Sequence, residues 1–213
     1  MDIKKKYAIN HSKTDNQSFY LNIRLFNTYN TIIKKILKQD LSGENIDLGC
    51  GDGYFSKVCA SKGIKSYSYD YPKFDIEKDI LPHRDNSIDF VTMNAVIEHI
   101  SNPSHILSEI NRVLKAGGLI FVRTPNWRLD YKNFYNDPTH VKPYTPDTLK
   151  NIFNLFEFNI LFLEPGLICK DWFWWRLPNI IKWYIVSKIR GGTKSILCVA
   201  TKINDIAKDD RTI

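Results

Sequence analysis

The chain has 213 residues, which is enough for one domain with a large hydrophobic core. Hydrophobic residues make up 43% and charged residues 25% of the sequence, values that exclude wholesale disorder. The formal net charge of +7 is compatible with an anionic partner and with an ordinary basic protein. The four cysteines form no CxxC pair, and no cysteine or histidine group has metal-ligand spacing, so we expect no bound metal.

The sequence contains no recognisable targeting or membrane-spanning segment. Its first ten residues are polar and rich in lysine, with no apolar stretch after them, so we expect no signal peptide. Charged residues and a proline interrupt the longest apolar region, 172–189, which argues against a membrane span. We therefore expect a cytoplasmic protein with a tail and helix over 1–43, one domain over 44–203 and a C-terminal tail over 204–213.

Hydrophobic periodicity predicts helices and strands that alternate along most of the chain. In chain order we expect a helix over 19–37, a strand over 46–48, a helix over 55–61, strands over 64–69 and 88–93, a helix over 103–114, a strand over 119–123, a helix over 145–153 and strands over 158–163 and 195–201. Thr145 is the expected N-cap of its helix, with Pro146 at the first helical position. The alternation predicts an α/β fold with a mostly parallel sheet, whose last two strands could pair antiparallel at one edge.

A glycine-rich turn joins the first predicted strand to the helix that follows it. Glycines alternate in this turn, after Asp47, and so differ from the GxGxxG fingerprint of dinucleotide-binding proteins. Glycine lets a ligand approach the backbone closely and permits positive φ. Because Asp47 and Asp52 are carboxylates, the turn favours a cationic ligand such as S-adenosylmethionine over NAD.

Four stretches of the sequence carry a family resemblance. They read IDLGCGDG (46–53), DILP (79–82) with DNSID (85–89), VIEHI (96–100) and EINRVLKAGG (109–118). In this order they resemble the class I S-adenosylmethionine-dependent methyltransferases of the small type 11 and type 23 group, over about residues 44–163. The resemblance implies a Rossmann-like α/β fold, a mostly parallel seven-stranded sheet and S-adenosylmethionine as cofactor.

The resemblance also implies which residues contact each part of the cofactor. Asp47, Gly49, Gly51 and Gly53 would line its methionine half, Asp70 would bond its ribose, Asp79 and Ile80 would contact its adenine, and Asn94 and Ala95 would lie beneath the transferred methyl group. Cys50 and Tyr71 are further expected cofactor-binding residues. Asp79 follows Asp70 too closely for the helix and strand that the family normally has there. We expect a loop and a short third strand in this place, and Asp75 then competes for the ribose or adenine role.

The segments TPNW (124–127) and DPTHVKPYT (137–145) are expected to border the methyl acceptor, since such loops follow the carboxyl ends of strands. His140 is our candidate for a general base, and the alternative is a histidine that fixes the loop by hydrogen bonds. His99, in the Glu98-His99 pair, has the same two interpretations: a base, or a packed residue at the start of a helix.

An aromatic-rich insertion, 165–192, has three interpretations: a lid over a hydrophobic or sugar-like substrate, a packing or homodimer interface, or a peripheral membrane contact through 172–190.

The predicted function is methyl transfer to a small-molecule acceptor, with an oxygen of a sugar, lipid precursor or secondary metabolite as first choice. An RNA methyltransferase and a cofactor-binding protein without catalysis are the alternatives. Nucleic acid is disfavoured because the basic residues form no stripe interleaved with aromatic ones.

Overall fold

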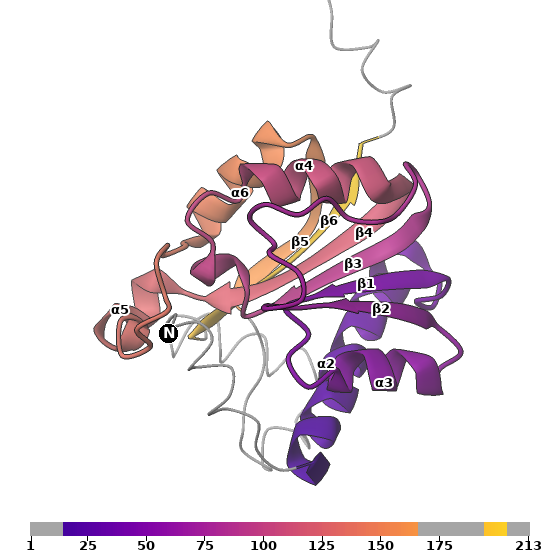
Figure 1. Ribbon diagram of the computed structural model, residues 1–213, viewed down its shortest axis with the longest axis horizontal. Coiled ribbons are helices and arrows are strands. Elements are labelled where there is room, and N and C mark those ends of the chain that lie inside the picture. The colour runs from indigo at the N-terminus through magenta and orange to yellow at the C-terminus, as the bar shows by residue number, and fades with distance from the viewer. Residues whose placement is uncertain (1–14, 166–193, 204–213) are drawn as a thin grey trace, which may run out of the picture.

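A computed structural model of the protein describes residues 15–165 and 194–203 (Figure 1). In chain order its elements are α2 (Asp15–Leu37), β1 (Glu44–Leu48), α3 (Tyr54–Ser61), β2 (Lys65–Tyr69), β3 (Ile88–Asn94), the 3-10 helix η1 (Ile97–His99), α4 (Ser104–Val113), β4 (Leu114–Pro125), α5 (Trp127–Phe134), α6 (Pro146–Leu155), β5 (Phe158–Pro165) and β6 (Ser195–Lys202). The predicted terminal tails and, apart from Pro165, the aromatic-rich insertion lie outside the described residues.

The strands form one sheet in the order β2-β1-β3-β4-β6-β5. Strands β1, β2, β3 and β4 pair in parallel, whereas β6 is antiparallel to both β4 and β5. The predicted α/β fold with a mostly parallel sheet is therefore confirmed, and so is the antiparallel pairing of the last two strands. Within the described residues the sheet has six strands.

The expected short third strand is wrong. The segment after β2 instead forms two successive turns, in which Phe74 N donates to Asp70 O at 3.0 Å and Asp79 N donates to Asp75 O at 2.8 Å. These backbone groups are bonded within the segment, so they cannot extend the sheet beyond β2. Among the described strands, β2 consequently forms one edge of the sheet.

Helices cover both faces of the sheet, with α4 and α6 on one face and α2 and α3 on the other (Figure 1). Side chains of successive β4 residues pack on opposite faces of the sheet, because side chains alternate in direction along a strand. Ile120 and Val122 belong to one hydrophobic cluster, and Phe121 belongs to the other. No helix in the part of the chain that the structure describes is long and apolar enough to cross a bilayer.

Helix α2 is tied to the sheet by Tyr29, whose side chain is fully buried. Its ring lies 4.6 Å from that of Phe121 and 5.9 Å from that of Phe55, measured between ring centroids. Its hydroxyl donates to Oδ1 of Asn94, the last residue of β3. Helix α2 therefore reaches the carboxyl end of the central strands.

Two short helices follow β4. The predicted start of α6 is confirmed, since the Thr145 hydroxyl accepts from Thr148 N at 3.2 Å, Thr145 N donates back to the Thr148 hydroxyl at 2.8 Å, and Pro146 is the first helical residue. Helix α5 was not predicted from the sequence. It is only eight residues long and contains a non-helical residue, Asp130, so its periodicity is weak.

The buried ring of Phe121 offers a test of the core beneath α2. Phe121→Ala removes a side chain with no exposed surface and leaves a cavity, so we expect the free energy of unfolding to fall by about 3–5 kcal/mol. Urea unfolding followed by circular dichroism measures this loss. Leu155→Ala is the control, because that side chain is 79% exposed and its loss should change stability by less than about 0.5 kcal/mol. Equal losses in the two variants would contradict this packing.

Candidate functional site

The glycine turn between β1 and α3 leaves open space above two of its glycines. Gly49, Gly51 and Gly53 all have positive φ, at 66°, 52° and 71°. A Cβ on Gly49 would lie 2.3 Å from Cγ2 of Val96, whereas a Cβ on Gly51 or Gly53 would meet nothing within 4 Å. Gly49 is therefore required by packing, and the space beside Gly51 and Gly53 is available to a ligand.

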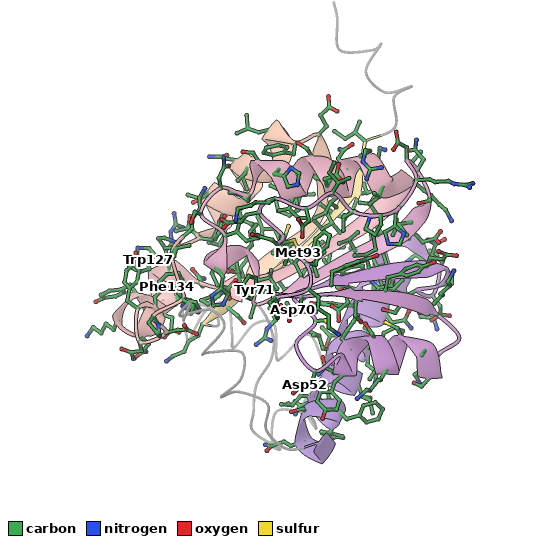
Figure 2. All side chains as sticks on the ribbon, in the orientation of Figure 1. Asp52, Asp70, Tyr71, Met93, Trp127 and Phe134 are labelled. Atoms are coloured by element: carbon green, nitrogen blue, oxygen red, sulfur yellow. The ribbon has the colours of Figure 1, made fainter. Side chains whose placement is uncertain are left out.

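Asp70 connects the end of β2 to this turn. Its Oδ2 accepts from Gly51 N at 2.6 Å, and its Oδ1 accepts from Tyr71 N at 2.7 Å. Figure 2 shows Asp70 and Tyr71 at the same edge of the sheet as Met93 of β3. A carboxylate has about four acceptor positions, so Asp70 keeps capacity for ligand hydroxyls while its orientation is fixed by the backbone.

Asp47 is the buried carboxylate of the site. Its Oδ1 accepts from the Thr92 hydroxyl at 2.9 Å and its Oδ2 from the Ser56 hydroxyl at 3.4 Å. Burial raises the pKa of Asp47 to about 7, despite these two hydrogen bonds. A cationic ligand nearby would favour its ionised form. Burial likewise raises the pKa of the Cys50 thiol to about 11, so Cys50 is unsuited to act as a nucleophile.

Asn94 and Ala95 form the turn that leaves β3. Asn94 accepts from the Tyr29 hydroxyl, and Ala95 N donates to Arg123 O at 2.8 Å. Ala95 is exposed and has φ 57°, a left-handed conformation that costs a non-glycine residue about 1–2 kcal/mol. The hydrogen bond to β4 holds this strained turn at the carboxyl edge of the sheet.

The predicted adenine contacts lie on the segment that lacks the third strand. The Asp79 carboxylate is exposed and accepts from Asp75 N at 2.7 Å, which folds it back over its own turn. Ile80 is 69% exposed, and Asp75 pairs with Lys78 Nζ at 2.8 Å. The structure therefore brings Asp70 to the glycine turn, whereas Asp79 is bonded to the backbone of Asp75. The roles of Asp79 and Asp75 at the adenine remain predictions.

The loop before α6, which the sequence predicts to border the methyl acceptor, packs against η1. His99 Nδ1 lies 3.1 Å from Thr139 O and 2.9 Å from its hydroxyl oxygen. The Thr139 hydroxyl in turn donates to Asp137 Oδ1 at 2.6 Å. Because carbonyl oxygens only accept, these contacts place a proton on Nδ1 of His99.

His140 is fixed in the same way. Its Nδ1 donates to Phe134 O at 2.7 Å, and its Nε2 lies 3.8 Å from Oδ2 of Asp137. Its ring lies 4.7 Å from that of His99, between centroids. Figure 2 shows Phe134 and Trp127 on α5, at one end of this edge. The hydrogen bonds expected of a loop-fixing histidine are present, and in the neutral ring they leave a lone pair on Nε2.

Glu98 is a site residue that the sequence did not single out by itself. It is completely buried, and its Oε2 accepts from the Thr124 hydroxyl at 2.9 Å. Its Oε1 is one of three buried side-chain polar atoms in the described residues that have no hydrogen-bond partner. Burial raises the pKa of Glu98 to about 7. Its adjacency to His99 was the available signal, but the burial of its side chain could not be seen from the sequence.

The other two unpartnered atoms are Nε of Arg123 and the hydroxyl of Tyr144. Arg123 lies near the end of β4, and Tyr144 bridges to Asn126, which follows β4 directly. Buried polar groups in folded proteins are nearly always paired. Three unpaired atoms from segments at or after the carboxyl ends of β3 and β4 are therefore typical of a ligand-binding region.

Residues 21–162 match the family model described as a methyltransferase domain. The chain belongs to this family. The resemblance noted from the sequence is thus confirmed for the family, which covers both the glycine turn and the loop containing His140.

Curated relatives agree with this assignment. A probable S-adenosylmethionine-dependent methyltransferase of Mycobacterium tuberculosis is 25% identical over 158 residues, which cover 67% of this chain and 55% of the relative. A tRNA (carboxymethyluridine(34)-5-O)-methyltransferase of Schizosaccharomyces pombe is 32% identical over 118 residues, or 48% of this chain and 50% of the relative. The chain spans about half the length of the curated relatives it matches.

Solved structures support the fold. A SAM-dependent methyltransferase from Archaeoglobus fulgidus superposes with a TM-score of 0.66 at 21% identity, covering 94% of this chain and all of that one. The class I methyltransferase fold is therefore confirmed, with the sheet shortened to six strands in the described residues.

The contrast between two glycines tests the turn. Gly49→Ala forces a Cβ against Val96, so we expect a loss of about 2–4 kcal/mol in the free energy of unfolding. Gly51→Ala meets no neighbour and should lose only about 1 kcal/mol, from its positive φ. Urea unfolding without ligand measures both losses, and a larger loss for Gly51→Ala would contradict the described turn.

Asp47 predicts a specific pH dependence of stability. With a folded pKa of about 7 against an ordinary value of 3.8, the folded protein retains a proton that the unfolded chain loses between these values. Stability therefore falls as pH rises through this window. Relative to Asp47→Asn, the wild type should lose about 2–3 kcal/mol between pH 5 and 8, measured by urea unfolding. A difference that stays constant over this range would exclude a buried, protonated Asp47.

Proposed function

We propose that the protein is an S-adenosylmethionine-dependent methyltransferase that methylates an oxygen of a small-molecule acceptor. Family membership and the glycine turn support the methyltransferase assignment. The observation that carries the choice of an oxygen acceptor is the pair formed by His140 and Asp137, on the loop that packs against η1. A hydroxyl acceptor needs a group that takes its proton, and this pair is such a group.

The residues of the turn fit the cofactor. The open space beside Gly51 and Gly53 admits its methionine half, and the acceptor capacity of Asp70 suits its ribose hydroxyls. Burial raises the pKa of Asp47 to about 7, and the cationic part of the cofactor would favour the ionised form of this carboxyl. S-adenosylmethionine supplies a methyl group on a positively charged sulfur. The chain then has to hold the acceptor oxygen close to that methyl group and keep water away.

His140 and Asp137 have different roles in proton transfer: His140 accepts the proton, and Asp137 stabilises the charge that forms. The hydrogen bond from Nδ1 to Phe134 O selects the tautomer with its lone pair on Nε2, so Nε2 is the atom that accepts the acceptor's proton. The imidazolium that forms has Asp137 Oδ2 at 3.8 Å to stabilise it. His99 fixes the loop through Thr139, which keeps His140 in place.

Relatives support an oxygen acceptor of either of two classes. Besides the tRNA methyltransferase, a ubiquinone biosynthesis O-methyltransferase of Dechloromonas aromatica is 27% identical over 108 residues, or 40% of this chain and 46% of the relative. RNA is thus the second candidate acceptor, and the net charge of +7 is compatible with it. A homodimer remains a prediction. So does a membrane contact through residues 172–190, which lie outside the described part of the chain.

Calorimetric titration with S-adenosylmethionine, combined with a methyl-transfer assay, tests this division of roles. Asp70→Ala should abolish binding of the cofactor, whereas His140→Ala should bind it as the wild type does. With a hydroxyl acceptor, His140→Ala should lose about 10²–10⁴-fold in rate, the usual contribution of a general base. Absence of binding heat from the wild type would refute the methyltransferase assignment, and full activity of His140→Ala would remove it as the base.

The acceptor class is decided by supplying labelled cofactor with two sets of acceptors. One set contains sugar nucleotides and hydroxyl-bearing lipid precursors, and the other contains total tRNA. Label transferred to the first set supports the proposal. Label found only in tRNA would replace it with the RNA alternative.

A further inference from the structure

Three metal-ligating side chains converge at the acceptor side of the site. Glu98 and His99 come from η1 and His140 from the loop before α6. Each of them offers one ligand atom, and these atoms all lie within 4.8 Å of one another. Cysteine and histidine spacing along the sequence gave no hint of this group, because His140 lies far from the other two in the chain.

We propose that Glu98, His99 and His140 bind one divalent metal ion of the zinc and manganese class. Two imidazole nitrogens and one carboxylate oxygen form a donor set that suits these ions. With three protein ligands, the ion keeps open positions for an oxygen of another molecule.

The unpartnered oxygen of Glu98 is the first support. The Glu98 side chain is completely buried, and Oε1 has no hydrogen-bond partner, whereas Oε2 is held by Thr124 at 2.9 Å. A buried carboxylate oxygen without a donor is costly unless a cation compensates it. The Thr124 bond fixes the carboxylate and leaves Oε1 for that cation.

The orientation of the two histidines is the second support. Both rings place Nδ1 against a backbone carbonyl, that of Thr139 for His99 and that of Phe134 for His140. Histidines that bind metals through one ring nitrogen commonly donate the other N–H to a carbonyl or carboxylate, which fixes the tautomer. In their neutral forms both rings therefore have their lone pair on Nε2.

The backbone holds the two segments together. Val141 N and Lys142 N both donate to Glu98 O, at 2.9 and 3.0 Å. Ligand atoms around a tetrahedral or octahedral ion lie about 3–3.5 Å apart, given metal–ligand bonds near 2.1 Å. Ion binding would therefore bring the most widely separated ligand atoms, now up to 4.8 Å apart, closer together by about 1–2 Å.

The ion would change how the acceptor loses its proton. A hydroxyl bound to a divalent metal has a lower pKa, so the bound ion promotes deprotonation while His140 serves as a ligand. In the metal-free protein His140 keeps the proton-accepting role described above. That a hydroxyl occupies the open position rests on the proposed function, whereas binding of the ion does not.

Metal binding is measured directly on the 213-residue chain, without a purification tag and after treatment with a chelator. Calorimetric titration with Mn²⁺ and Zn²⁺ should give one site per chain. Glu98→Gln, His99→Gln and His140→Gln should each weaken binding at least tenfold, and His83→Gln, a half-buried histidine outside the group, should not. Circular dichroism establishes that each variant is folded, and the ion should raise the melting temperature of the wild type but not that of Glu98→Gln.

Cobalt distinguishes this site from binding at cysteines such as Cys50. Bound Co²⁺ should give visible d–d absorption without a sulfur-to-cobalt charge-transfer band. A charge-transfer band, unchanged affinity in all three glutamine variants, or no binding at millimolar ion would each overturn the proposal. Methyl transfer by chelated protein that binds no ion would support the proposed function and contradict the metal site. Ion binding without methyl transfer to any acceptor would sustain the site and refute the function.

Discussion

Parallel pairing of β1, β2, β3 and β4 is the constraint on which the rest of the structure depends. It places the carboxyl ends of four strands at one edge, so the segments that follow them meet there whatever their distance in the sequence. The glycine turn follows β1, Asp70 follows β2, Ala95 and Glu98 follow β3, and α5 follows β4. The candidates for binding or proton transfer lie on these segments, on the loop between α5 and α6, or, like Asp47 and Asn94, near the carboxyl end of a strand.

Periodicity and caps were sufficient to predict most elements, because long apolar stripes and a Thr-Pro cap act locally. The expected third strand failed because hydrogen bonds within two turns compete with pairing along β2. Motif spacing identified the glycine turn and Asp70, which the structure connects directly. The surroundings of Glu98 could not be predicted, since its burial and the approach of His140 arise only when the loop folds onto η1.

Two buried carboxylates flank β3 at this edge. Asp47 precedes the glycine turn and Glu98 lies in η1, and burial raises the pKa of each to about 7. Removal from water therefore keeps both groups close to neutrality until a cation approaches. Each carboxylate can therefore favour a nearby positive charge, Asp47 beside the glycine turn and Glu98 beside the loop that contains His140.

The hydrogen bond between Tyr29 and Asn94 connects α2 to the turn that leaves β3. Asn94 is expected beneath the transferred methyl group, so its side chain would contact both α2 and the cofactor. By thermodynamic reciprocity, a ligand that orders Asn94 would stabilise the packing of α2 on the sheet, and this packing would increase the affinity for the ligand by the same factor.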